Sequence, residues 1–154
     1  TITAANASSI SDGASALILA SQEAADQHGL KPLARMLGHT THSRHPSEFT
    51  IAPVGAIEKL MKKLGWGVND VDLFEINEAF AVVTLMAMDD LGLPHDKVNV
   101  FGGACAQGHP IGSTGSRIIA TLIHALRTKG GKRGIASLCI GGGEATAVAV
   151  ELID

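Results

Sequence analysis

The chain has 154 residues, enough for one domain with its own core, since a domain of this size buries roughly 70% of the surface of its unfolded chain. A net charge of −3, from 12 basic and 15 acidic residues, argues against a nucleic-acid-binding surface, and no block of like charge marks a helix that lies on a membrane. The composition therefore favours a globular domain without nucleic-acid or membrane partners.

Cysteine usage and hydropathy indicate in which cellular compartment the protein lies. Cys105 and Cys139 form neither a CxxC pair nor a Cys/His spacing typical of a metal site, and free thiols fit a reducing environment. No apolar run reaches the roughly 18 to 20 residues that span a bilayer, and the first residues do not resemble a signal peptide. We therefore expect a cytoplasmic location. Because the sequence begins at Thr1 without methionine, we also expect it to be a segment of a longer protein.

The first half of the chain predicts strands and helices in alternation. The short apolar run 14–20 predicts a buried strand, and the polar stretch 21–28 predicts a helix closed by a glycine. An extended segment is expected over 33–42. Apolar residues then recur at helical spacing over 51–64, which predicts an amphipathic helix.

The second half continues this alternation up to a glycine-rich loop. Residues 71–76 alternate like a strand, and Asn77 is a favourable N-cap for a helix over 78–91. A short strand is expected over 98–101, directly before the loop. A helix over 111–127 follows the loop.

The chain is predicted to end in a β-hairpin. Strands over 135–140 and 146–153 flank the glycine turn 141–143. Because strands and helices alternate before this hairpin, the sequence predicts an α/β fold with a mixed five-stranded sheet covered by helices on both faces.

Three polar or reactive side chains are predicted at the carboxyl ends of strands or in loops before helices. They are Asn77, His109 in the glycine-rich loop 102–115, and Cys139. Ligands of α/β sheets bind at such places. A histidine near a thiol raises its thiolate content, and an amide or imidazole N–H holds a developing oxyanion. The predicted chemistry is therefore acyl transfer or enolate formation.

Each of these side chains also has an ordinary structural explanation. Taken alone, Asn77 is typical of a helix cap, and Cys139 of a small buried apolar residue. Cys105 is interpreted as structural and is assigned no chemistry.

Two other motifs favour no ligand. His39, His42 and His45 lie in an expected loop without an acidic or cysteine partner, so we interpret them as solvated surface rather than a metal site. The run 112–115 lacks the lysine of a phosphate-binding loop. These motifs therefore predict neither a metal site nor a nucleotide-phosphate site, and the resemblance described next implies no metal and no resident cofactor.

Four segments closely resemble, in order and spacing, the C-terminal signatures of the thiolases. They are NASSISDGA at 6–14, NEAFA at 77–81, GACAQGHPIG at 103–112 and CIGGG at 139–143. The resemblance covers the whole chain and implies that residues 1–154 are the C-terminal domain of a thiolase, a protein of two similar halves. It also implies that the cysteine that carries the acyl group lies in the N-terminal half, which is absent from this sequence.

The resemblance gives the predicted site residues roles. His109 would accept the proton of the nucleophilic cysteine and then help to polarise the thioester oxygen. Cys139 would remove the α-proton of acetyl-CoA in condensation, or return it in thiolysis. Asn77 would position a water that forms an oxyanion hole with His109, and the backbone N–H of Gly141 would contribute to a second hole.

The resemblance also implies the ligand. Ser8 would contact the pantetheine arm of coenzyme A, and Ala79 and Phe80 would line the same tunnel. The implied activity of the full-length protein is Claisen condensation of two acetyl-CoA or thiolysis of 3-ketoacyl-CoA, in a homodimer or tetramer, with the isolated domain inactive. Coenzyme A thioesters are then substrates rather than cofactors. The alternative is a non-catalytic, thiolase-like acyl-CoA-binding or partner subunit.

The sequence departs from the thiolase pattern at three places. Ser9 stands where glycine is common, Gln107 stands where a bulky apolar residue is usual, and 51–56 lacks part of the expected glycine and proline pattern. The Gln107 side chain either makes the acyl pocket more polar or turns away into solvent. The length of the acyl chain is left open.

Overall fold

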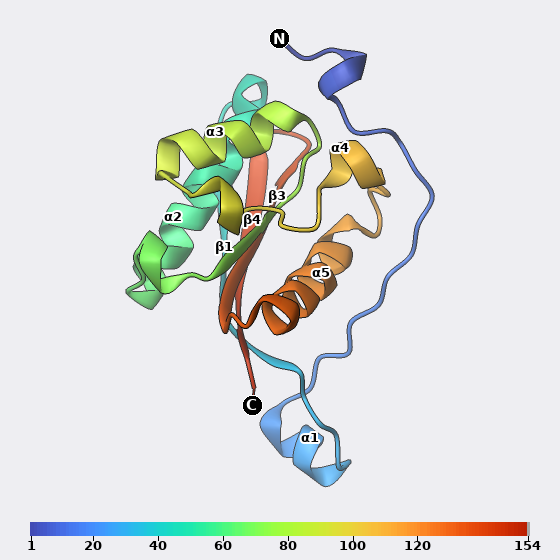
Figure 1. Cartoon of the computed structure of the whole chain (residues 1–154), viewed down its shortest axis with the longest axis vertical. Helices are drawn as coiled ribbons and strands as arrows, with labels where there is room; N and C mark the ends of the chain where they lie inside the picture. The colour runs from blue at the N-terminus through green and yellow to red at the C-terminus, as the bar shows by residue number, and fades with distance from the viewer. Residues whose placement is uncertain (154) are drawn as a thin grey trace.

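The computed structural model describes residues 1–153 and contains one four-stranded sheet in the order β1-β4-β3-β2 (Figure 1). The strands are β1 (Ala34–Ser43), β2 (Leu73–Ile76), β3 (Arg133–Ile140) and β4 (Glu144–Leu152). β2 runs parallel to β3, whereas β4 is antiparallel to both β3 and β1. The mixed sheet of an α/β fold is therefore confirmed.

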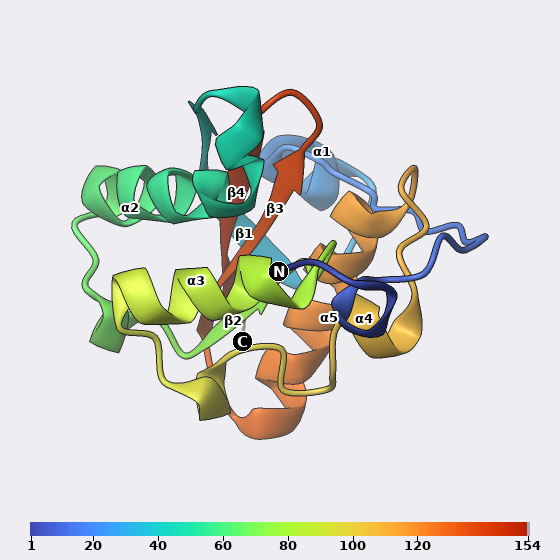
Figure 2. The ribbon, with the colours of Figure 1, turned by 90° about the horizontal axis from the view of Figure 1, so that it is seen from above.

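Helices cover both faces of the sheet, as predicted. α2 (Ala52–Leu64) and α3 (Ala81–Leu91) lie on one face, and α5 (Thr114–Lys129) lies on the other (Figure 2). Side chains of a strand point to alternate faces, so neighbouring residues of β3 enter different cores. Ile135 packs with α2 and α3, whereas Ala136 packs with α5.

Short helices fill the connections. α1 spans Gln22–Gln27, α4 spans Ala104–Gln107, and 3-10 turns span Ala4–Asn6, Pro46–Ile51, Val68–Asp70 and His95–Lys97. Within residues 1–153, no helix has both the length and the apolar character needed to cross a membrane.

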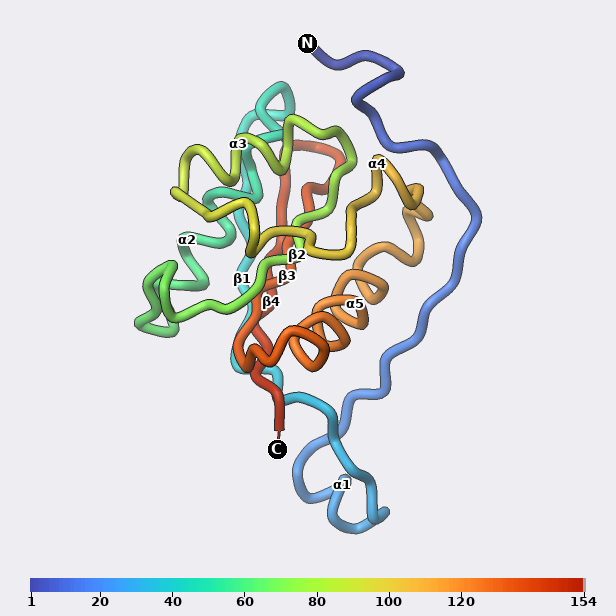
Figure 3. Tube along the Cα trace, in the orientation of Figure 1, coloured from blue at the N-terminus to red at the C-terminus, as the bar shows by residue number. Residues whose placement is uncertain are grey.

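The prediction of a strand over 14–20 was wrong. These residues run past α5 as an extended segment that pairs with no strand of the described chain (Figure 3). Apolar side chains there face outward, and Ile18 is 92% exposed. The strand predicted over 98–101 is reduced to one parallel bridge, between Phe74 and Val98. The sheet therefore has four strands rather than the five predicted.

The helix predicted over 78–91 begins at Ala81 instead, so the prediction of Asn77 as its N-cap was wrong. Asn77 continues the pairing of β2 with β3, because its N–H donates to the Ser137 carbonyl (2.9 Å). The chain stays extended up to Phe80, which bridges to the N-terminal segment and precedes the helix.

The other predicted elements are confirmed within a few residues. Helices predicted over 21–28, 51–64 and 111–127 correspond to α1, α2 and α5, and the extended segment 33–42 corresponds to β1. The terminal hairpin is β3 and β4, joined by a glycine turn. Since β1 continues to Ser43, His39 and His42 lie on a strand rather than in a loop.

Candidate active site

Asn77 occupies the carboxyl end of β2 and is 2% exposed. Its backbone is fixed by the bond to β3 described above. Its side-chain Nδ2 lies 3.4 Å from Nε2 of His109, so the structure brings together two of the three predicted catalytic residues. The other side-chain atom, Oδ1, is buried and has no hydrogen-bond partner among the described residues.

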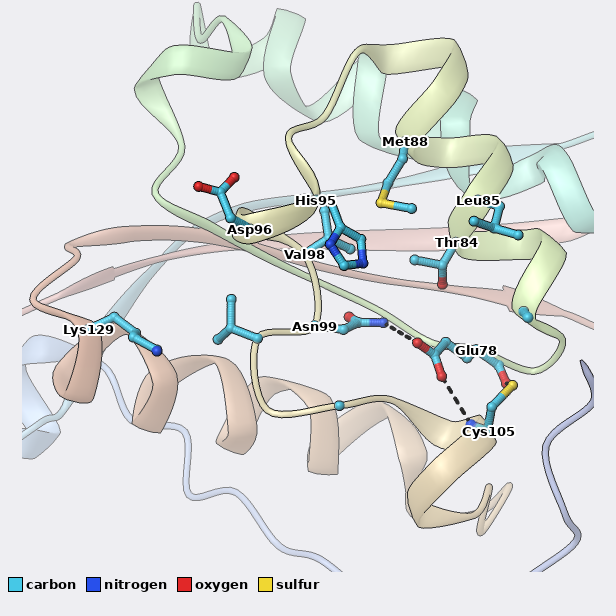
Figure 4. A pocket seen from close by; sticks show the side chains of 13 residues that line it. Glu78, Thr84, Leu85, Met88, His95, Asp96, Val98, Asn99, Cys105 and Lys129 are labelled. Carbon is cyan, nitrogen blue, oxygen red and sulfur yellow. Dashed lines mark hydrogen bonds between the residues drawn. The ribbon is translucent and has the colours of Figure 1, made fainter.

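The loop that carries His109 is held from two sides. The backbone N–H of His109 donates to the carbonyl of Ser9 (2.9 Å), which ties the loop to the N-terminal segment. On the other side, the Glu78 carboxylate accepts hydrogen bonds from the Cys105 N–H (3.1 Å) and from Nδ2 of Asn99 (3.1 Å), beside a surface pocket (Figure 4). Gly103 leaves room for this carboxylate, because a Cβ there would overlap the Glu78 carboxyl group and displace it.

Thr114 contacts the ring nitrogen of His109 that lies opposite Asn77. The Thr114 hydroxyl lies 2.7 Å from Nδ1 of His109 and 3.0 Å from the carbonyl oxygen of Pro110. A hydroxyl has one hydrogen, so when it donates to Pro110 it accepts from a protonated Nδ1. In that tautomer the lone pair resides on Nε2, which faces the amide of Asn77.

The environment of His109 favours the neutral ring. Burial lowers the pKa of His109, and the positive charge of Arg117 lowers it further. A neutral imidazole with a free lone pair on Nε2 is a general base. Thr114, the first residue of α5, was not predicted as a site residue from the sequence, because its contact with the ring depends on how the loop folds back.

Cys139 lies near the end of β3, the strand that neighbours β2. Because these strands are parallel, Asn77 and Cys139 leave the same edge of the sheet, and Ser137, bonded to Asn77, is two residues before the thiol. Burial raises the pKa of Cys139, whose side chain packs against the α2–α3 core. Within residues 1–153, no hydrogen bond joins Cys139 to Asn77 or His109. The structure therefore brings Asn77 and His109 into contact and places the Cys139 thiol near the end of β3, the neighbouring strand.

The predicted backbone site at Gly141 lies in the turn after β3 and is exposed. The two glycines that follow it have φ values of 95° and 92°, a conformation that favours glycine. Gly143 packs against the carbonyl of Arg44, so this tight turn is held against the end of β1.

The residues implied at the coenzyme A site also come together. The Ser8 hydroxyl donates to the carbonyl of Ala79 (2.8 Å), so toward a ligand it can only accept a hydrogen bond. Phe80, next to Ala79, packs edge-on against Phe49 with a centroid distance of 5.8 Å.

Gln107 and Cys105 make contacts within the loop region. The Gln107 side chain donates to the carbonyls of Phe101 (3.0 Å) and Gly102 (3.2 Å) and accepts from Arg117 (3.0 Å). It therefore supports the loop from the outside. Cys105 is exposed and in no disulfide, and its Sγ lies 3.8 Å from the carbonyl oxygen of Glu78. We assign it no chemistry.

A family model described as "Thiolase, C-terminal domain" matches residues 30–152. The chain belongs to the thiolase family. An acetyl-CoA acetyltransferase from Chromobacterium violaceum is 52% identical over 151 residues, which are 98% of this chain and 38% of that protein. A cytosolic acetyl-CoA acetyltransferase from Mus musculus is 48% identical, with the same coverage.

Solved thiolase structures share the fold. The crystal structure of human mitochondrial 3-ketoacyl-CoA thiolase in complex with CoA matches with a TM-score of 0.95 and 47% identity, over 99% of this chain and 38% of that one. The chain thus spans less than two fifths of these thiolases, and the resemblance to a thiolase C-terminal domain is confirmed.

Proposed function

We propose that this chain is the C-terminal half of an acyl-CoA C-acyltransferase that condenses two acetyl-CoA or cleaves 3-ketoacyl-CoA by thiolysis. The observation that carries the proposal is the Asn77–His109–Thr114 arrangement, which turns Nε2 of His109 toward the Asn77 amide, with the Cys139 thiol at the end of the neighbouring parallel strand. The acetyl-CoA acetyltransferase activity named for the Chromobacterium violaceum relative and the CoA bound in the human thiolase support it.

Thiolysis would begin with a cysteine supplied by the N-terminal half. Its proton passes to Nε2 of His109 as its sulfur attacks the C3 carbonyl of 3-ketoacyl-CoA. The C2–C3 bond then breaks, the acyl group stays on this cysteine, and the bonding electron pair leaves as the enolate of acetyl-CoA. The enolate takes the proton of the Cys139 thiol, and acetyl-CoA departs.

The second half of the reaction would restore both groups. The Cys139 thiolate takes the proton of an incoming CoA thiol, whose sulfur attacks the acyl group. The nucleophilic cysteine leaves with the proton held by His109, and acyl-CoA is released. Condensation is the reverse sequence, with the Cys139 thiolate removing the α-proton of acetyl-CoA.

Two oxyanions would need hydrogen-bond donors along this path. The buried, unpartnered Oδ1 of Asn77 is suited to accept from a water, which with the protonated Nε2 of His109 would hold the enolate oxygen. The exposed backbone N–H of Gly141 would serve the oxygen of the acyl-cysteine.

Exposed apolar surface supports an N-terminal half as partner. Residues 1–29 lie outside the match to the C-terminal-domain family, and Ile10 and Ile18 are each 92% exposed. Large exposed apolar patches mark interaction surfaces. The N-terminal half would cover this segment, in a homodimer or tetramer that acts on acyl-CoA thioesters, and the cytosolic mouse relative supports a cytoplasmic location.

The direct test is an assay of acetoacetyl-CoA cleavage by CoA, with the chain joined to its N-terminal half. Turnover that depends on His109 and Cys139 is expected. Binding of CoA without any turnover would overturn the proposal and favour the non-catalytic, acyl-CoA-binding alternative.

The 154-residue chain alone is expected to show no thiolysis, because neither of its cysteines is the acyl acceptor in this mechanism. Its exposed apolar segment should also cause self-association, measurable by light scattering. The double variant Ile10→Ser/Ile18→Ser is the control and should associate less. Acetoacetyl-CoA cleavage by the unchanged chain, or a clean monomer, would contradict this prediction.

Thr114→Val in the complete enzyme is expected to lower kcat about tenfold, the effect of ~1.4 kcal/mol. Valine has a similar shape but cannot accept from Nδ1, so the ring loses the partner that fixes its tautomer. Thr114→Ser keeps the hydroxyl and should retain most of the activity. Equal kcat values for the valine and serine variants would show that Thr114 does not orient His109.

A further inference from the structure

A polar cluster behind the His109 loop takes no part in the chemistry proposed above. Arg117 follows Thr114 by three residues, so both side chains lie on the same face of α5. Thr114 holds the ring of His109, and Nη1 of Arg117 donates to Oε1 of Gln107 (3.0 Å). One face of one helix therefore holds the loop at two points, on either side of Gly108.

Gln107 connects Arg117 to the first residues of the loop by hydrogen bonds. Its Nε2 donates to the carbonyls of Phe101 (3.0 Å) and Gly102 (3.2 Å), while its oxygen accepts from Arg117. All of its side-chain polar atoms are engaged within the chain. An apolar side chain at this position would make none of these bonds.

A buried carboxyl group completes the cluster from the sheet side. Glu75 of β2 is 4% exposed and lies on the same face of the strand as Leu73, which packs in the α5 core. Its Oε1 and the Nε of Arg117 are both buried without a hydrogen-bond partner among the described residues. Buried, unpaired polar atoms destabilise the fold, so the presence of these two requires an explanation, and Glu75 is only two residues before Asn77.

The charges in this region are coupled. Burial raises the pKa of Glu75 to about 7, while Arg117 from α5 lowers it and Glu78, after β2, raises it. The same Arg117 lowers the pKa of His109. Arg117 is thus the one charged group, within the described chain, that acts on both the buried carboxyl and the catalytic imidazole.

We propose that Glu75, Arg117 and Gln107 form a positioning network for His109. In this network Arg117 anchors the loop through Gln107 and keeps the imidazole neutral, and ionisation of Glu75 offsets the charge of Arg117. The effect on turnover rests on the proposed acyltransferase function, whereas the effect on the imidazole does not.

The test of the charge effect is an NMR titration of the His109 ring in the chain joined to its N-terminal half, because the 154-residue chain alone is expected to self-associate. Arg117→Gln is expected to raise the pKa of His109 toward 6.5, because a positive neighbour is removed. Arg117→Lys keeps the charge and should keep the pKa low. Arg127→Gln, an exposed residue of the same helix, is the matched control and should change nothing.

The same titration tests Glu75. In the unchanged chain, the ring resonance of His109 should show a second, smaller step near pH 7, where Glu75 ionises. Glu75→Gln is isosteric and cannot ionise, so this step should vanish. A second step that persists in Glu75→Gln would overturn the role of Glu75.

The positioning effect is measured in the complete enzyme. Gln107→Leu is expected to lower kcat for thiolysis about tenfold with little change in KM, because the loop loses its bonds to Arg117 and to the two carbonyls. An unchanged His109 pKa in Arg117→Gln, or an unchanged kcat in Gln107→Leu, overturns the network. If Arg117→Gln does not fold, Gln107→Leu decides the question. If the unmodified complete enzyme has no thiolysis activity while the His109 pKa responds to Arg117→Gln, the proposed function fails and the network stands.

Discussion

His109→Ala in the complete enzyme is expected to lower kcat for acetoacetyl-CoA thiolysis by about 10³, within the range of 10² to 10⁴ typical of a general acid–base. Without Nε2, no group accepts the proton of the nucleophilic cysteine, and the enolate loses a donor. KM should change little, because the ring contacts reacting atoms rather than the distant parts of CoA. The fold should persist, since the loop is also held through Glu78 and Gln107.

His39→Ala is the control, because His39 is exposed on β1, outside the site, and should leave kcat unchanged. The measurement is steady-state kinetics together with a thermal unfolding curve for each variant. A His109→Ala enzyme within tenfold of the wild-type kcat would rule out the proposed base.

The pH profile gives a second check on the same residue. His109 acts as a base only when neutral, and burial with the charge of Arg117 lowers its pKa. Activity should therefore be lost as pH falls through a value below 6.5 rather than at it. An acid limb of kcat/KM above 6.5 would show that another group controls it.

Much of the site could be predicted from sequence because it depends on short-range order. Asn77 directly follows an alternating strand, and Cys139 lies at the end of another, so parallel pairing places both at one edge of the sheet. The glycines around His109 show that the backbone passes through a crowded, tightly turned loop. These features are local, and the contact of Asn77 with His109 agrees with them.

The errors arise where the structure depends on distant partners. An apolar run such as 14–20 is suited to a strand, but a strand also needs a neighbour, and no strand within residues 1–153 pairs with it. Asn77 has the composition of a cap, yet its N–H is used by Ser137 of β3, so the helix starts later. The roles of Arg117 and Thr114 depend on side-chain contacts that no spacing in the sequence reveals.

Cys139→Ser is expected to lower kcat by about 10³ in both directions, the second large effect. Serine is nearly isosteric, so the packing against the α2–α3 core should survive. A hydroxyl, however, is a far weaker acid than a thiol. It neither donates a proton readily to the enolate nor ionises to remove the α-proton of acetyl-CoA.

Burial raises the pKa of the Cys139 thiol, so the thiol stays protonated through neutral pH in the free enzyme. Both directions begin from this protonated form, because condensation is the reverse of thiolysis and the thiolate arises only when the thiol gives its proton to the enolate or to the departing CoA. Both rates should therefore fall as the pH rises toward a pKa above the ordinary thiol value of 9.0. Rates measured in both directions on one enzyme preparation test this. Condensation that accelerates at alkaline pH, or substantial α-proton exchange of acetyl-CoA in Cys139→Ser, would mean that a different group carries the proton.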